Sequence, residues 1–532
     1  MSGFRTPEQP RGQSVLWAHR LEDAIPQDHP VRLLDYLLHS EAFDETFTSW
    51  AGQYVLLEGK PPYHPRDLSA LYLYGMMNRI RSSRQLESAC HNRLDVIWLM
   101  QSQQPDHSTI ASFVRRHDKH LRKLFRNVLG VAVRAGLVGL DHLAVDGTKI
   151  EADAGKSSVR SEKKIASWLS HLDEKIDALE SEWAENERRE TLVFGDQAPW
   201  VPPKGHTKKH KLAKLQRQRD RLDKALQEIA RRRRERASGK PPKPIASTTD
   251  PDSRCMKDKE GRSKPNYNGQ AAVDDVQGVI AAAEVNDQPN DSGQLTPLVE
   301  QSIENCGQKP RAVSADSQYN TGPELASMEE KGIISYLPDS GHNSEATPAD
   351  EAAGQALEAV ARGQTLTDEQ WEALPKSSRG LIDKSAFCYD KHKNAYRCPA
   401  ARWLPVLRTS HDTKKWGTAI RRQYGHPSAC ASCERAAQCC KHPAKGRVIN
   451  RDQYEDHRQR LRERMATPVG RETYRRRKQT VEPRFGQIKH VLGVRRFMRR
   501  GLEAVRTEWS LVCTAVNIGI LLRHWKEVAP IL

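Results

Sequence analysis

The order of strand-like and helix-like segments between Leu137 and about residue 340 constrains the fold of this 532-residue chain most. In LVGLDHLAVDGTKI apolar and polar residues alternate, which predicts a strand ending near Asp146. The segments NYNGQAAVD and VIAAAEVN predict two adjacent strands joined by a turn at Gly278. A helix over Leu295–Ile303, a short strand ending at Asp316, a second helix and the strand IISYLP follow. This order predicts a mixed α/β sheet, with antiparallel strands first and a parallel crossover after them.

Two helical patterns interrupt this core between residues 160 and 236. Apolar residues recur every three or four positions, first at Ile165, Trp168, Leu169, Leu172, Ile176, Leu179 and Trp183, and then at Leu212, Leu215, Leu222, Leu226 and Ile229. A link with proline and glycine around residues 199–205 separates them, so we expect an antiparallel helical hairpin. The second helix closes with Arg231, Arg232, Arg233 and Arg234, which form either a solvated helix end or a contact to DNA phosphates.

Helical segments flank this core. Within the first of them, Ser83–Cys90 and Thr109–Arg116 carry arginines that are either solvated or part of a helix-turn-helix-like DNA reader. Near the C-terminus, residues 502–525 place Val505, Trp509, Val512, Val516 and Ile520 on one helix face, which predicts a buried closing helix. We therefore expect a helical N-terminal DNA-binding domain (1–135), a core in three pieces (136–160, 241–340 and 451–532), a basic helical hairpin (161–240) and a polar Cys-containing insertion (341–450).

The charge balance points to a polyanionic partner. Lys and Arg number 85 against 68 Asp and Glu, a net charge of +17, and a basic surface concentrates phosphate around itself. We see no apolar run near the roughly 20 residues of a spanning helix, and no signal-peptide pattern. The sequence thus favours a nucleic-acid partner, no membrane and a cytoplasmic location.

Two aspartates stand where strands are expected to stop, Asp146 in LAVDGT and Asp316 in VSADSQ. Taken singly, each could be an ordinary turn residue. Carboxyl ends of strands are also where open α/β sheets place ligands, and two carboxylates meeting there repel each other unless they share a cation. Mg²⁺ prefers one or two carboxylates together with substrate phosphate oxygens. The pair predicts metal-assisted phosphoryl transfer.

A third acid, Glu482, lies in the basic helical segment ETYRRRKQTVEPRFGQIK. Lys478 and Lys489 lie four residues before and seven after Glu482, so a regular helix would place all three on one face. They are either surface ion pairs or a metal ligand flanked by two lysines that grip the DNA backbone.

Several motifs in this order resemble the DDE transposases of the insertion-sequence four/five superfamily, and most closely the eleven-eighty-two-type branch. HPVRLLDYL, LYLYGMMNRIRSSRQLE and PDHSTIASF resemble its N-terminal domain. VDGTKIEADA, STTDPDSR, YNGQAAVD, ADSQYNT and VEPRFGQIK followed by RRFMRRGLEAVRTEW resemble its catalytic core. The resemblance implies a ribonuclease-H-like core with a mixed sheet.

The same resemblance implies that Asp146, Asp316 and Glu482 bind two Mg²⁺ or Mn²⁺ ions for DNA cleavage and strand transfer. It implies that the partner is double-stranded DNA, both the terminal inverted repeats and the target. It also implies a homo-oligomer on that DNA and a location in the bacterial cytoplasm. The family spacing is Tyr, two residues, Arg, three residues, Glu, six residues, Lys. Glu482 and Lys489 fit it, Lys478 stands at the Arg position, and Tyr474 lies one residue early.

Two other functions fit the same sequence: a catalytically inactive DNA-binding protein of this fold, and a metal-dependent nuclease that cuts without joining. The three acids speak against the first. A joined DNA product would separate a transposase from the second.

A cysteine-containing segment follows the core strands. Cys398, Cys430, Cys433 and Cys439 predict a structural Zn²⁺ site, although only the pair 430/433 has the usual CxxC spacing. Cys440, His426 and His442 are alternative ligands, and ordinary reduced cysteines in a loop are the competing interpretation.

Overall fold

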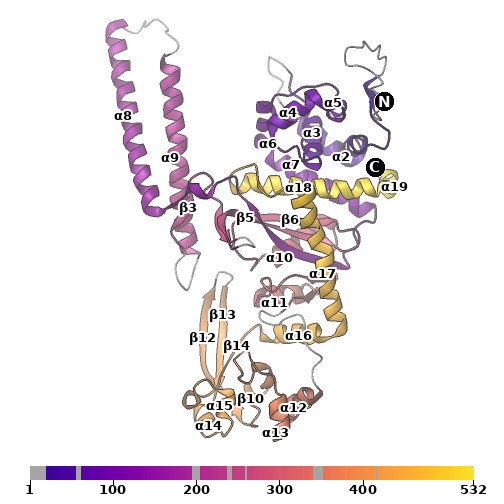
Figure 1. The fold of residues 1–532 in the computed structure, drawn as a ribbon, viewed down its shortest axis with the longest axis vertical. Coiled ribbons are helices and arrows are strands. Elements are labelled where there is room, and N and C mark those ends of the chain that lie inside the picture. The colour runs from indigo at the N-terminus through magenta and orange to yellow at the C-terminus, as the bar shows by residue number, and fades with distance from the viewer. Residues whose placement is uncertain are drawn as a thin grey trace, which may run out of the picture. The chain divides into compact units, whose positions relative to one another are not determined.

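The computed structural model describes residues 20–54, 61–194, 204–235, 243–257, 261–338, 351–377, 379–414 and 417–532 (Figure 1). The chain forms two compact units, which are described separately. The first contains the residues up to Leu137 together with Gln487–Val494 and Thr507–Leu532, and the second contains Val138–Gly486 and Arg495–Arg506. The link predicted around 199–205 lies largely outside the described residues.

The first unit is helical, as predicted. Its N-terminal helices are α1 (Pro30–Leu38), α2 (Glu41–Ala51), α3 (Pro65–Met77), α4 (Ser83–Asn92), α5 (Leu94–Leu99), α6 (His107–Arg116) and α7 (Asp118–Arg134). Ser82 and Gln85 form a capping box on α4, and the Asp106 carboxylate caps α6. Because α5 lies between α4 and α6, the two arginine-bearing helices are not consecutive.

Two arginines of this unit, Arg79 and Arg81, bind its C-terminal part. The Arg81 guanidinium lies 2.7 Å from the Glu508 carboxylate, which is 1% exposed. Arg79 donates to the carbonyl of His490 at 2.6 Å. Glu508 lies on α18 (Leu502–Arg523), and the predicted apolar face of this helix is fully buried. The arginines near α4 therefore have a structural role.

Helix α18 also tests the prediction that the chain has no apolar segment long enough to span a membrane. Among the described residues it is the one helix long and apolar enough to cross a bilayer, which corrects the expectation that no such run exists. Of its apolar window 83% is buried inside the protein, as in the core helix of a globular domain.

The second unit is built on a mixed sheet. It contains β1 (His142–Glu151), β4 (Arg254–Lys257), β5 (Ser263–Asp274), β6 (Ile280–Asn286), β7 (Ala312–Ser314) and β8 (Ile334–Tyr336), in the order β4-β5-β1-β7-β8 with β6 also paired to β5. Strand β5 pairs antiparallel with β1 and β6, whereas β1–β7 and β7–β8 are parallel. Helices α10 (Leu295–Cys306) and α11 (Gly322–Glu330) form the crossovers. The predicted mixed α/β core is confirmed.

The predicted hairpin is α8 (Glu162–Phe194) and α9 (Lys204–Arg234), which lie side by side (Figure 1). Ile165 and Leu172 pack with Leu222 and Ile229, and these four are among its buried residues. Short strands β2 (Val159–Ser161) and β3 (Ile245–Ser247) pair antiparallel at its base. The helical periodicity therefore identified most of the packed face, but Trp168, which was predicted on it, is exposed.

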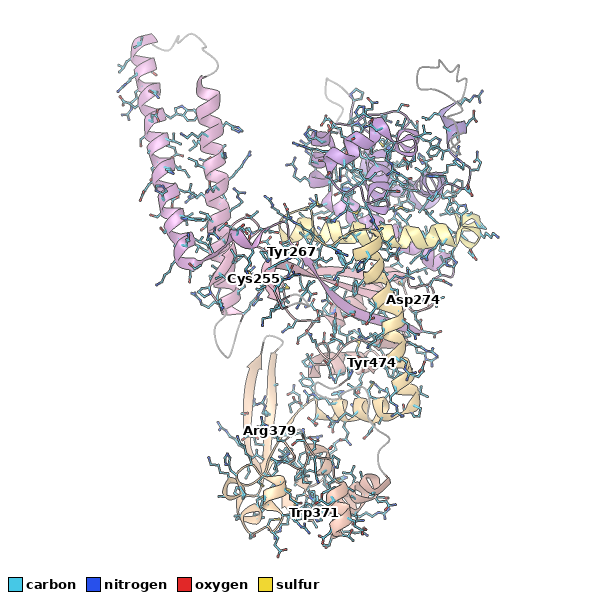
Figure 2. All side chains as sticks on the ribbon, viewed as in Figure 1. Cys255, Tyr267, Asp274, Trp371, Arg379 and Tyr474 are labelled. Atoms are coloured by element: carbon cyan, nitrogen blue, oxygen red, sulfur yellow. The ribbon has the colours of Figure 1, made fainter. Side chains whose placement is uncertain are left out.

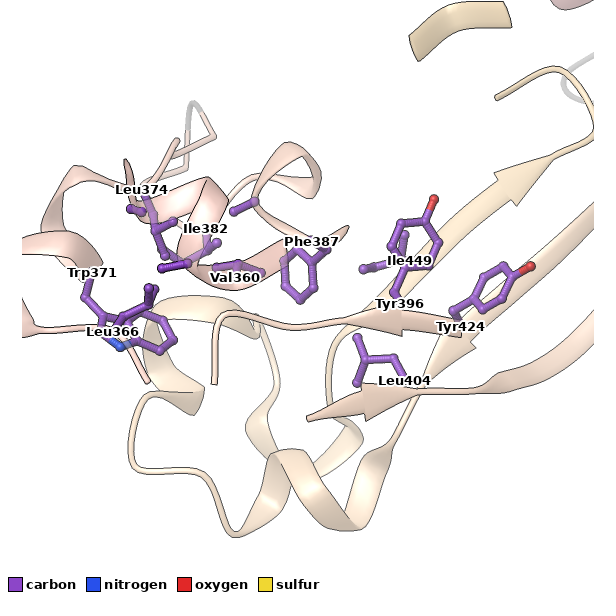
Figure 3. Close-up of a cluster of buried hydrophobic side chains, with 13 residues drawn as sticks. Val360, Leu366, Trp371, Leu374, Ile382, Phe387, Tyr396, Leu404, Tyr424 and Ile449 are labelled. Atoms are coloured by element: carbon purple, nitrogen blue, oxygen red, sulfur yellow. The ribbon is translucent and has the colours of Figure 1, made fainter. Parts of the chain in front are cut away.

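The segment predicted to be a polar Cys-containing insertion has a core of its own. It contains α12 (Glu351–Arg362), α13 (Asp368–Ala373), β9 (Cys388–Asp390), β10 (Ala395–Arg397), β11 (Trp403–Leu404), β12 (Val406–Lys414), β13 (Gly417–Gly425), α14 (Pro427–Ala431), α15 (Ala436–Cys439) and β14 (Val448–Asp452). Trp371, Phe387, Tyr396 and Tyr424 are buried together in it (Figure 3). Strands β9, β10 and β11 have only two or three residues each, too few to show a period in the sequence. We call this part of the chain the cysteine lobe.

After the cysteine lobe, α16 (Glu455–Ala466) and α17 (Pro468–Gly486) return to the sheet, and α17 contacts β1, β5 and β7. Its buried residues are Gly470, Arg477, Val481 and Phe485. A π-helical turn over Gln487–Val491 follows. Helix α17 thus has one face against the strands that carry the predicted acids.

Candidate functional site

The structure places Asp146 and Asp316 at the same region of the sheet. Strand β1 does not end at Asp146 as predicted, but continues to Glu151. Its parallel neighbour β7 pairs with it only as far as Ala144↔Ser314, and Asp316 follows two residues later. Asp146 is therefore the first acid of β1 beyond the end of β7. Continuing this parallel register by two residues brings Asp316 level with Asp146, and the charge of Asp316 contributes to the raised pKa of Asp146.

Burial and mutual repulsion make both carboxylates hard to ionise. Burial raises the pKa of Asp146 to about 6, against a partial opposing effect of Arg477, and the charges of Asp316 and Asp291 add to the rise. The pKa of Asp316 is also raised, mainly by burial and next by Asp291. Such a group of acids favours a bound cation, and the donor set is one that Mg²⁺ accepts.

Asp291 is a neighbouring acid that sequence reasoning left out. It is 9% exposed and accepts hydrogen bonds from Asn268 Nδ2 at 2.6 Å and Gln270 Nε2 at 2.5 Å. A Cβ atom on Gly147 would lie 2.5 Å from its Oδ1, so the backbone next to Asp146 must be glycine. The glycine of the motif VDG thus allows the Asp291 carboxylate to lie close to the backbone beside Asp146.

Arg477 supplies the positive charge at these acids. It is 6% exposed, and its Nη1 lies 3.2 Å from Asp146 Oδ2. Its guanidinium carbon lies 5.6 Å from the centre of the Tyr474 ring, and Figure 2 shows Tyr474 on α17. The pattern of Tyr, two residues and Arg is satisfied by Tyr474 and Arg477. Arg477 is the side chain that lies against Asp146 whereas Lys478 is exposed, but four residues instead of the family's three separate Arg477 from Glu482.

Glu482 is exposed on α17, about 140° around the helix from Arg477. Because α17 ends at Gly486 and a π-helical turn follows, the regular spacing that linked Lys478, Glu482 and Lys489 does not continue to Lys489. Among the described residues, no three His, Cys, Asp or Glu side chains are grouped so that they could hold a metal ion. The structure brings together the two aspartates but not the complete predicted triad.

The TDPDSR segment has a structural role beside this site. Asp250 is fully buried and accepts hydrogen bonds from Tyr267 Oη at 2.9 Å and from the Gly501 amide at 3.1 Å. Asp252 accepts from the Leu502 amide at 2.8 Å. These bonds fix the start of α18.

The arginine run at the end of α9 is largely engaged within the protein. Arg232 is 6% exposed and donates to the carbonyls of Pro251, Asp252 and Ser253 at 3.0 to 3.2 Å. Arg231 lies 2.7 Å from Glu228 and 2.5 Å from Asp287, and Arg233 lies 2.7 Å from Glu162. The prediction that Arg231, Arg232, Arg233 and Arg234 all contact DNA is wrong for the buried Arg232. Arg234 is exposed.

Arg232→Ala should therefore destabilise the protein by about 1–3 kcal/mol, because it leaves the buried carbonyls of residues 251–253 without their side-chain donor. Arg234→Ala, which removes the same charge from an exposed position, should change stability by less than about 0.5 kcal/mol. Unfolding in urea would measure both. Equal, small effects would show that the buried contacts of Arg232 do not matter for folding.

Five cysteines gather in the cysteine lobe. Cys398, Cys430, Cys433, Cys439 and Cys440 line a cavity of about 30 Å³. Burial raises the pKa of Cys439 to about 12 and that of Cys440 to about 11, and neighbouring cysteines add to both. The alternative ligand His426 is the N-cap of α14, because its Nδ1 accepts a hydrogen bond from the Ala429 amide at 3.2 Å. The four predicted thiols and Cys440 thus line one cavity, although within the described part of the chain no three of them are grouped closely enough to hold a metal ion as they stand.

Two family profiles match the chain. One is described as a transposase DDE domain and covers residues 397–522; the other is described as a transposase domain (DUF772) and covers residues 19–116. The first includes Arg477, Glu482 and all five cysteines of the cavity, whereas Asp146 and Asp316 lie between the two matches. No curated protein matches the sequence.

Proposed function

Since the chain belongs to the DDE transposases of the insertion-sequence four/five type, we propose that it binds the terminal inverted repeats of a mobile element and catalyses metal-dependent DNA cleavage and strand transfer. The observation that carries the proposal is the neighbouring pair Asp146 and Asp316 beside α17. The double-stranded target DNA uses the same site. Because two element ends must be joined, we also propose a homo-oligomer on DNA, in the bacterial cytoplasm.

Asp146 and Asp316 would hold Mg²⁺ or Mn²⁺. Bound there, two such ions would activate the attacking hydroxyl and stabilise the leaving oxygen. Arg477 neutralises the acids before the cation binds, and its guanidinium can then turn to a non-bridging phosphate oxygen. Glu482, on the same helix, is proposed as the third acid. A change in its side chain or in α17 when DNA binds would be needed to bring it to the aspartates.

Other parts of the proposal concern binding. Lys478 is exposed on α17, and Lys478 and Lys489 are proposed to contact the DNA backbone. The cysteine lobe is proposed to hold one structural Zn²⁺.

Incubating the purified chain with DNA that carries the element ends tests this function. Wild type with Mg²⁺ should give nicked and joined products, and EDTA or Glu482→Ala should abolish both. Glu472→Ala, an exposed acid three turns earlier on α17, is the matched control and should remain active. Cleavage without any joined product would favour a nuclease. Tight binding without cleavage would favour the inactive DNA-binding protein.

A further inference from the structure

A polar cavity lies between α17 and the turn that joins β5 to β6. It measures about 380 Å³, a volume sufficient for a ligand group, and is lined by Asp275–Gly278 from the turn and by Arg476, Gln479, Thr480 and Arg484 from α17. None of these residues belongs to the acid pair. Arg476 directly precedes Arg477 on the helix, so the cavity lies beside the candidate active site.

Arg484 and the glycine of the turn build one wall. Arg484 donates to the Gln277 carbonyl at 2.8 Å. Gly278 has φ +69°, and a Cβ atom there would lie 2.2 Å from Arg484 Nη2. Glycine is therefore required both for the backbone conformation and for the approach of the guanidinium. This wall holds a positive charge in place.

Arg476 provides a second positive charge. Its side chain is exposed, and within the described part of the chain no carboxylate lies within ion-pair distance of it. The neighbouring Arg475 differs, because its guanidinium lies 3.2 Å from Glu472. Gln479 adds a neutral side-chain amide to the same cavity, whereas the Thr480 hydroxyl donates to the Arg476 carbonyl at 3.0 Å. The lining thus offers two guanidinium groups and several hydrogen-bond donors.

The cavity also contains one acid, Asp275, whose negative charge would repel a bound anion. Its Oδ1 is buried without a hydrogen-bond partner, and its Oδ2 lies 3.9 Å from Nδ1 of the buried His142. The carboxylate is therefore turned mainly toward β1. Its charge should weaken anion binding without preventing it.

We propose that this cavity binds a backbone phosphate of the DNA next to the strand that is cut. Arginine is the side chain best suited to phosphate, since its planar donors match two phosphate oxygens. A phosphate held at Arg476 would guide the DNA along α17 past Arg477 toward Asp146. The inference rests on the proposed function for its choice of DNA, and it adds a contact that neither Lys478 nor Lys489 supplies.

The test measures binding of a random-sequence DNA duplex to the full chain over a range of salt concentrations in EDTA. Arg476→Gln should reduce the slope of log affinity against log salt by about 0.9, the value for one phosphate contact. Over a fourfold rise in salt concentration, the ratio of wild-type affinity to variant affinity should then change by roughly 3.5-fold. Arg475→Gln, which removes an equal charge one residue away, should leave the slope nearly unchanged. Asp275→Asn should increase affinity.

Equal slopes for Arg476→Gln and Arg475→Gln would overturn the proposal. Weaker binding by Asp275→Asn would also overturn it, because the ligand would then donate to the carboxylate rather than present an anion. The measurement needs no cleavage. If the wild-type chain cleaves DNA but Arg476→Gln leaves the salt slope unchanged, only the phosphate site in the cavity is disproved. If Arg476→Gln changes the slope but the wild-type chain does not cleave DNA, only the proposed catalysis is disproved.

Discussion

Asp146→Asn should reduce Mg²⁺-dependent DNA cleavage by about a thousandfold or more, with little change in DNA affinity. Asparagine keeps the shape of the side chain but cannot share the charge of a divalent cation with Asp316. Gel analysis of cleaved DNA ends under single-turnover conditions would measure the loss. The control is Asp141→Asn, which removes an exposed carboxylate just before the same strand and should remain active.

The same variant has a second readout that does not depend on catalysis. Mg²⁺ should raise the unfolding temperature of wild type, because a ligand bound only to the folded state stabilises it. Asp146→Asn should lose most of this rise. Full Mg²⁺ stabilisation of the variant together with full cleavage would remove Asp146 from the site.

Without Mg²⁺, Asp146→Asn should be more stable than wild type above pH 6. The folded-state pKa of Asp146 is raised from 3.8 to about 6, so ionisation costs folding free energy as the pH rises between these values. Above pH 6 the cost is on the order of 3 kcal/mol, and the neutral asparagine avoids it. Below pH 4 the two proteins should have similar stability. Urea unfolding at several pH values would measure the difference.

The purified protein should contain about one zinc ion per chain, and removing it should unfold the cysteine lobe. Five thiols around one small cavity match the ligand type of a structural site, and such zinc contributes directly to folding, with about 10–16 kcal/mol of binding free energy in small zinc domains. The apolar cluster around Trp371 and Tyr396 packs against Cys398 and Cys439, so it should loosen when the thiols separate.

Cys433→Ser should abolish zinc binding and make the cysteine lobe sensitive to proteolysis. Cys388→Ser is the matched control, because Cys388 packs against the same apolar cluster but does not line the cavity. Elemental analysis and limited proteolysis would compare them. Metal-free wild type that resists proteolysis as well as the untreated protein does would contradict the zinc proposal.

Periodicity in the sequence was sufficient to predict the elements of the core. The alternation around Asp146, the paired strands near Gly278 and the hairpin residues Ile165 and Ile229 all depend on local patterns that the fold keeps. The core of the cysteine lobe was not predicted because β9, β10 and β11 have only two or three residues each and its core residues are far apart in the sequence.

Long-range contacts decided the roles of the charged residues. Arg232 is a basic residue in a basic run, and only the carbonyls of residues 251–253 show that it is buried. Asp291 became part of the acidic group only through Asn268 and Gln270 on another strand.

The sequence by itself therefore determined the mixed sheet, the order of its elements and two of the acids. The tertiary structure decided which residues of α17 face those acids. One step along a helix turns a side chain by about 100°, so Arg477 points to Asp146 while Lys478 is exposed. Composition and motif spacing cannot fix that rotation, because it depends on how α17 packs against β1 and β5.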